Sequence, residues 1–93
     1  MQLAKCVAEL VGTMLFLTVI AKSGGDKYVI VLGLLAAILF MGNVSGGHFN
    51  PAVTLMQYVN GSMVQDDALC YVGSQLLGAV AAWKVAGFSA TSL

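Results

Sequence analysis

The most restrictive feature of the sequence is an uncharged segment of 38 residues, from Tyr28 to Gln65, that contains no Asp, Glu, Lys or Arg. As one continuous α-helix it would measure about 57 Å, nearly twice the ~30 Å hydrocarbon core of a bilayer. The segment must therefore break, and the stretch SGGHFNP at residues 45–51 supplies the break. Its glycines admit backbone angles that other residues resist, and Pro51 suits only the first turn of a helix.

The second part of this segment predicts a short helix over residues 51–60. Asn50 is a good N-cap for it, and Asn60 followed by Gly61 marks its end. Ten residues of helix reach only about 15 Å, half of the hydrocarbon core. This half-helix cannot cross a membrane, so we expect it to enter the membrane and return to the same side.

The composition agrees with a membrane protein, because 59% of the residues are hydrophobic and 9% are charged, against about 25% charged in a typical soluble domain. Three segments are long and apolar enough for helical spans of about 20 residues, namely residues 3–21, 28–43 and 67–88, the last with Asp66 or Asp67 as a cap. The predicted fold is an all-α, multi-pass integral membrane protein with three transmembrane helices plus one re-entrant half-helix. We expect residues 1–93 to form one unit.

The remaining polar residues exclude several functions. The net charge is zero and no basic run occurs, so no nucleic-acid partner is expected. The single histidine and the four acidic residues are scattered, which predicts no enzyme, no metal site and no cofactor. Cys6 and Cys70 lie near the starts of different predicted helices, and we interpret both as reduced packing residues, with a disulfide or a reactive thiol as the alternative. A signal peptide at the start is disfavoured because Glu9 interrupts its apolar region.

Small residues predict a face for close helix packing on the third span. They recur at every fourth position, at Ser74, Gly78, Ala82 and Ala86. Ala8 and Gly12 are a shorter version on the first span. The alternative is a generally alanine-rich helix with no special partner.

The half-helix also predicts a site near the middle of the membrane. Its N-terminus carries about half a positive elementary charge, and Asn50 adds a side-chain NH2 group. The preceding SGGH backbone has carbonyls without helical partners, which at this depth survive only against protein or a water-filled cavity. A water molecule there would offer its oxygen to the donors, while the positive end repels protons and cations. The sequence therefore favours a pore for neutral molecules over a cation channel.

The decapeptide SGGHFNPAVT, preceded by AELVGT and followed by GSQLLGAVAA, resembles the first half of the major intrinsic proteins, the aquaporin and aquaglyceroporin family. The resemblance covers nearly all of the chain and is greatest to bacterial water channels and some plant relatives. It implies a pore lined by Gly46, Gly47, His48, Asn50, Pro51 and Ala52, with a selectivity position at Ile30. Ile30 is aliphatic where the resemblance leads us to expect an aromatic ring, which implies a wider or more apolar constriction. Water and glycerol both remain candidate permeants.

The same resemblance assigns Glu9 and Gln75 as buried polar residues that brace the loop. Each assignment has an alternative. Glu9 could lie near a helix end and reach water, Gln75 could be satisfied by one neighbouring helix alone, and His48 could pack in the loop without touching the permeant.

The family has two such halves in inverted orientation, whereas this sequence contains one. A lone half would expose about eight peptide groups of the re-entrant loop to lipid, each at a cost of several kcal/mol if unsatisfied. We therefore expect a partner, either a second copy in a homo-oligomer or a separately encoded second half.

The lysines bear on the orientation in the membrane. The resemblance implies a cytoplasmic N-terminus, which places Lys5 inside and Lys22, Lys27 and Lys84 outside. One lysine inside against three outside is opposite to the positive-inside rule. The signal is weak or inverted, which is compatible with insertion in both orientations and antiparallel pairing.

The leading hypothesis is a half-length, aquaporin-like passive channel for water or small neutral solutes such as glycerol, surrounded by membrane lipid and completed by its partner. The alternative is a non-conducting truncated homologue that associates with full-length channels and modulates them. A neighbouring reading frame with its own Asn-Pro-Ala and a following Arg would favour the channel.

Overall fold

The computed structural model of the chain describes residues 2–87. This part consists of four helices and contains no strand: α1 (Leu3–Lys22), α2 (Lys27–Ser45), α3 (Pro51–Val59) and α4 (Gln65–Val85). Helices α1, α2 and α4 are long and apolar enough to cross a membrane, while α3 has nine residues. The predicted fold class, three spans and a half-helix, is confirmed.

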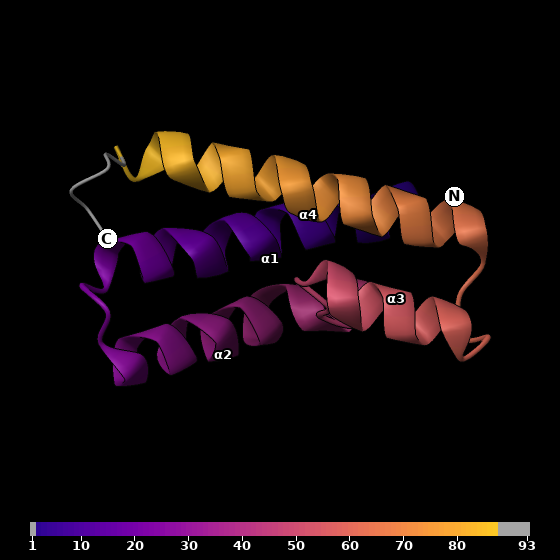
Figure 1. The fold of residues 1–93 in the computed structure, drawn as a ribbon, viewed down its shortest axis with the longest axis horizontal. Helices are drawn as coiled ribbons and strands as arrows, with labels where there is room; N and C mark the ends of the chain where they lie inside the picture. Colours follow the sequence, from indigo (N-terminus) through magenta and orange to yellow (C-terminus); the bar gives the residue numbers. More distant parts are fainter. Residues whose placement is uncertain (1, 88–93) are drawn as a thin grey trace.

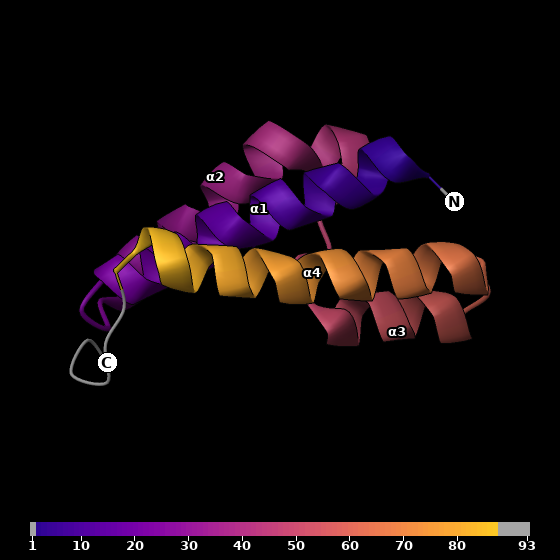
Figure 2. The ribbon, with the colours of Figure 1, turned by 90° about the horizontal axis from the view of Figure 1, so that it is seen from above.

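Helix α1 lies between α2 and α4 and packs against both (Figure 1). Helices α1 and α4 start at the same end of the molecule and run in the same direction, whereas α2 runs the opposite way (Figures 1 and 2). Helix α3 packs along the first half of α4. It begins near the middle of the 40 Å long axis and runs back toward the end where α4 starts (Figure 2). This is the re-entrant path that the length of the uncharged segment requires.

Local chemistry sets the helix ends. Helix α2 continues to Ser45 and stops where Gly46 takes a left-handed φ of 89° and donates its N–H to the Gly42 carbonyl at 2.8 Å. Helix α3 starts with Pro51 after Asn50, whose Oδ1 accepts the Ala52 N–H at 2.8 Å. The predicted cap for this helix is therefore present.

The start of α4 differs from the sequence prediction. The N-cap is Val64, with no side-chain hydrogen bond, so the expectation of a cap from Asp66 or Asp67 is wrong. Both carboxylates lie instead within the first turn, where they still interact favourably with the positive end of the helix. The helix ends at Val85, and the predicted end at residue 88 lies outside the described residues.

Close packing of α4 on α1 depends on the predicted small-residue face. A Cβ added to Gly78 would lie 2.7 Å from the Leu10 carbonyl oxygen, which is backbone and cannot move easily. Ala82 and Ala86 are also buried. Gly12 has a different role, because a Cβ there would overlap the ring of Phe49 from the loop before α3.

The prediction of reduced cysteines is wrong, because Cys6 and Cys70 form a disulfide that links α1 to α4. Their Cα atoms are 6.0 Å apart although 64 positions separate them in the sequence. The physical reason is the parallel arrangement: the fourth residue of α1 and the sixth of α4 lie at one level because both helices start together. Sequence spacing alone does not contain this register.

Candidate functional site

A buried carboxylate organises the loop between α2 and α3. Glu9 is fully buried. Its Oε1 accepts hydrogen bonds from the Phe49 N–H and from Gln75 Nε2, both at 2.8 Å. Its Oε2 accepts the Ser45 hydroxyl at 2.6 Å and the His48 N–H at 3.1 Å. Four donors on two oxygens suit an ionised carboxylate, which only accepts. The alternative that Glu9 reaches water is wrong.

Gln75 connects this carboxylate to the half-helix. Its Nε2 donates both to Glu9 and to Thr54 Oγ1, the latter at 2.9 Å. Thr54 Oγ1 in turn lies 2.8 Å from His48 Nδ1. Thr54 thus joins the side chains of His48 and Gln75. Gln75 thus joins α4 to α1 and α3, and the alternative of a single neighbouring helix is wrong.

The loop backbone is held in an unusual conformation. Gly46 and Gly47 have positive φ angles of 89° and 69°, and Phe49 has a φ of 52°, which an L side chain rarely adopts. Such a residue costs about 1–3 kcal/mol. The hydrogen bond from its N–H to Glu9 and the burial of its ring beside Gly12 offset this cost. The Tyr71 hydroxyl adds a hydrogen bond of 2.6 Å to the Ser45 carbonyl.

The loop is polar in two different ways on its two sides. The N–H groups of residues 47, 48 and 49 point inward and are bonded to Ser45 or Glu9. Within residues 2–87, no hydrogen bond reaches the carbonyls of Gly46, Gly47 or His48, or the side-chain NH2 of Asn50. Residues 50–52 are exposed. Free acceptors and then a free donor therefore follow one another along the outer side of the loop.

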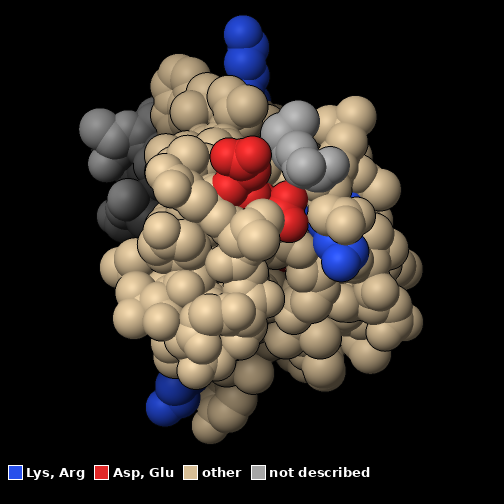
Figure 3. All heavy atoms as spheres, turned by 90° about the vertical axis from the view of Figure 1, so that its right-hand side faces the viewer, with Lys and Arg blue, Asp and Glu red and all other residues tan. Residues whose placement is uncertain are grey.

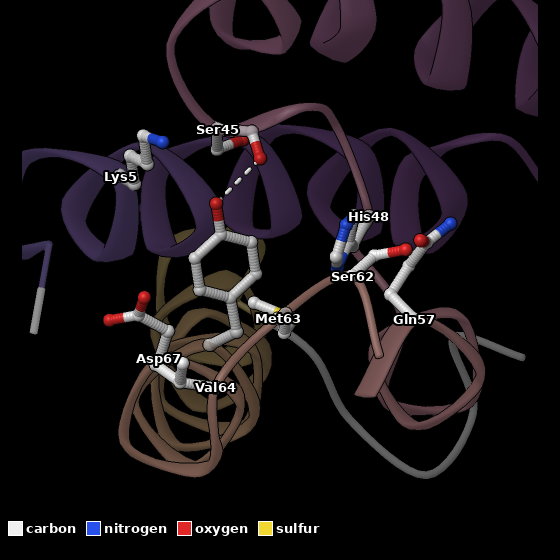
Figure 4. A pocket seen from close by; sticks show the side chains of 9 residues that line it. Lys5, Ser45, His48, Gln57, Ser62, Met63, Val64 and Asp67 are labelled. Atoms are coloured by element: carbon white, nitrogen blue, oxygen red, sulfur yellow. Dashed lines mark hydrogen bonds between the residues drawn. The ribbon is translucent and has the colours of Figure 1, made fainter. Parts of the chain in front are cut away.

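A polar cavity of about 320 Å³ opens beside this loop. His48 and Tyr71 both line it, with ring centroids 4.9 Å apart, and Lys5 and Asp67 lie on its other side (Figure 4). His48 thus contacts Thr54 of α3 through Nδ1 and also lines this open cavity. Ile30 lies near the start of α2, at the opposite end of the molecule, so the structure does not bring it to this cavity.

Sequence reasoning missed four residues of the network: Ser45, Phe49, Thr54 and Tyr71. Thr54 could have been predicted from the sequence, because it follows Asn50 by one helical turn in an apolar helix, where a buried hydroxyl needs a hydrogen-bond partner. Tyr71 follows Cys70 and precedes Gln75 by one turn, so it lies on the same face of α4. The role of Phe49 could not be predicted from the sequence, because its left-handed backbone conformation depends on contacts with α1.

Three helices of membrane-crossing length, with a half-helix whose N-terminus is fixed at mid-length, define a multi-pass integral membrane protein with a re-entrant loop. The chain belongs to the major intrinsic protein family, because the family model described as Major intrinsic protein matches residues 1–92. The sequence-based identification of the family is confirmed.

Individual relatives agree with this assignment. The chain is 32% identical to "Aquaglyceroporin AqpS" of Rhizobium meliloti over 88% of its length and 42% of that protein's. It is 39% identical to "Glycerol uptake facilitator protein-like 6" of Lactiplantibacillus plantarum, covering 84% of this chain and 40% of the relative. With "Aquaporin-8" of Mus musculus the identity is 41%, over 78% of this chain and 32% of the relative. No solved structure matches the chain significantly.

The chain thus spans about two fifths or less of the length of these relatives. The relatives are named as an aquaglyceroporin, a glycerol uptake facilitator-like protein and an aquaporin, in keeping with the prediction that this chain is not an enzyme.

Proposed function

We propose that residues 1–93 form one half of a passive channel for water or small neutral solutes such as glycerol. The observation that carries this proposal is the division of the loop, with its N–H groups bonded inside and its carbonyls and the Asn50 amide left free outside. Acceptors in sequence can replace the hydration of a small molecule, and the donor beside the positive helix end disfavours cations.

The proposed pore residues have distinct roles. The carbonyls of Gly46, Gly47 and His48 accept hydrogen bonds from the permeant. Asn50 donates to it at the point where Pro51 and Ala52 start the half-helix. Ile30 contributes an apolar constriction at the other end of the passage, and Glu9 and Gln75 brace the loop through the network described above.

The proposed channel requires a partner, because residues 50–52 are exposed in the single chain. A second half, from another copy or from a different chain, would close the passage and cover the free carbonyls. The names of the relatives include "Glycerol uptake facilitator protein-like 6" and "Aquaporin-8", and a proposed substrate class of small neutral solutes covers both glycerol and water.

A second candidate function is the modulation of full-length channels without conduction. The observation that favours it is that same exposed surface together with large apolar side chains exposed on α2 and α4, such as Phe40 and Leu77. These would let the chain associate with a complete channel in the bilayer.

Reconstitution separates the two functions. The purified chain in liposomes is tested for osmotic water and glycerol flux by light scattering, beside Asn50→Asp and the control Asn60→Asp. Aspartate at position 50 keeps the oxygen that caps Ala52 but replaces the NH2 donor by a charge. Asn60 is exposed at the end of α3, so its change adds the same charge outside the proposed pore.

We expect Asn50→Asp to lower the flux at least tenfold and Asn60→Asp to leave it near wild type. Flux that is indifferent to Asn50→Asp would contradict the pore assignment. A chain that is silent alone, and also with a second-half partner, but alters the flux of a co-reconstituted full-length family member would support the modulator instead.

A further inference from the structure

Two buried oxygen atoms between α1 and α4 have no hydrogen-bond partner. Within residues 2–87 these are Thr13 Oγ1 and Gln75 Oε1, and the two residues are only 3% and 2% exposed. Buried polar atoms without a partner are uncommon in folded proteins, and an ordered water molecule is a common partner for those that no protein group reaches. The two oxygens therefore point to a bound ligand.

Thr13 and Gln75 lie at the same level of the bundle. Each is ten residues from the first residue of its helix, and both helices start at the same end (Figures 1 and 2). A Cβ added to Gly78, one turn after Gln75, would lie 3.1 Å from Thr13 Cβ. The Gln75 amide in turn bonds to Glu9, one turn before Thr13. The two residues thus belong to facing surfaces of α1 and α4.

The donors of the Gln75 amide fix its orientation. Nε2 donates to Glu9 Oε1 and to Thr54 Oγ1, which uses both of its protons. The reverse orientation would bring Oε1 against the Glu9 carboxylate, and two acceptors cannot bond to each other. Oε1 is therefore left on the other side of the amide, where it is buried and needs a donor.

The Thr13 hydroxyl has a proton to donate. Thr18 on the same helix donates its hydroxyl to the Met14 carbonyl, one turn earlier, at 2.6 Å. Thr13 makes no such bond to any described residue, and its hydroxyl does not bond directly to Gln75 Oε1. A water molecule can accept one hydrogen bond and donate another, so a single water satisfies the hydroxyl and the carbonyl oxygen together.

We propose that α1 and α4 enclose a bound water molecule, which accepts a hydrogen bond from the Thr13 hydroxyl and donates one to Gln75 Oε1. This water holds the Gln75 amide in the orientation that presents Nε2 to Glu9 and Thr54. It is a fixed part of the brace and not a permeant, because neither Thr13 nor Gln75 lines the polar cavity beside the loop.

The site is remote from bulk solvent. Figure 3 shows the end of the bundle where α1 and α4 start, with lysine and acidic side chains on its surface. Thr13 and Gln75 are ten residues further along their helices, which corresponds to about 15 Å from that end. A water at this depth exchanges only when the helices separate, so we expect it to be ordered.

A crystal structure of the purified chain, at a resolution that shows ordered water, tests the proposal directly. We expect density for a water within hydrogen-bond distance of both Thr13 Oγ1 and Gln75 Oε1. A direct hydrogen bond between these two atoms, a Thr13 hydroxyl bonded to the Glu9 backbone carbonyl, or a contact without such density would overturn the proposal. The test uses the unmodified chain, so it does not depend on how well a variant folds.

The isosteric variant Thr13→Val gives a second measurement in detergent micelles, with Thr18→Val as its matched control. Loss of the Thr13 hydroxyl removes a partner of the bound water, and we expect the melting temperature to fall by about 4–8 °C. Thr18 is only partly buried, so Thr18→Val should lower it by less than half as much.

An unchanged or raised melting temperature in Thr13→Val would contradict the water bridge, because valine would then have removed a hydroxyl that was buried without a partner. Neither measurement involves conduction. A chain that holds this water but shows no flux with any partner would contradict the proposed function and leave the water site intact.

Discussion

Replacement of Glu9 by glutamine tests whether a buried charge holds the re-entrant loop. The amide of Glu9→Gln has one acceptor oxygen where the carboxylate has two. In one rotamer its NH2 group faces the His48 N–H, and in the other it faces the Phe49 N–H. Neither backbone donor can turn away, so one buried N–H loses its partner in either case.

The expected cost follows from the hydrogen bonds. An unpaired buried N–H costs about 1–3 kcal/mol. The two bonds that remain on the amide oxygen change from a charged to a neutral acceptor and lose about 1 kcal/mol each. We therefore expect Glu9→Gln to weaken the closed loop by about 3–5 kcal/mol, which corresponds to roughly a hundredfold or more in the opening equilibrium.

Amide hydrogen exchange measured by NMR in detergent micelles reports this directly, because the His48 and Phe49 N–H groups exchange when the loop opens. Asp66→Asn is the matched control, since it makes the same carboxylate-to-amide change at an exposed position and should cost less than about 1 kcal/mol. If protection of these two amides in Glu9→Gln stays within tenfold of wild type while the helices remain folded, the four-donor argument is refuted.

Three other substitutions test separate contacts. Gly78→Ala should lower the free energy of unfolding by about 1–3 kcal/mol, because the added Cβ would meet the backbone of α1. Gly73 has open space around it, so the control Gly73→Ala should leave the free energy of unfolding unchanged or raise it slightly. Thermal unfolding measures both. Thr54→Val keeps the shape but removes the acceptor for one buried donor, and a loss of about 1–3 kcal/mol is expected; an unchanged melting temperature would count against the network. Reductant should lower the melting temperature of the wild type by the equivalent of about 2–4 kcal/mol and leave Cys6→Ser, which lacks the bond to Cys70, unaffected.

Most of the fold could be predicted because it depends on lengths. A membrane of fixed thickness limits how far an uncharged segment can run, so the break at residues 45–51 and the half-helix after it follow from arithmetic. Asn50 and Pro51 determine the start of that helix by local backbone chemistry, which needs no tertiary contact.

The error about the cysteines concerns the relative position of helices. The disulfide between Cys6 and Cys70 depends on α1 and α4 starting at one level, and the sequence carries no measure of that level. The same parallel register brings Gln75 within hydrogen-bond distance of Glu9. The family resemblance predicted that both residues brace the loop, but the hydrogen bond between them depends on how α1 and α4 pack. The conformation of Phe49 is a further case, because a left-handed phenylalanine is unfavourable until the rest of the bundle surrounds it.

The packing of α3 has a consequence for biosynthesis. Helix α3 packs on α4, and α4 also supplies Gln75 and Tyr71 to the loop. During translation α4 is synthesised after α3. The half-helix α3 therefore lacks the surface of α4 on which it packs until α4 has been inserted. We expect chains truncated after residue 62 and released from the ribosome to leave the loop open to protease or to thiol reagents, and protection to arise only in chains that include α4.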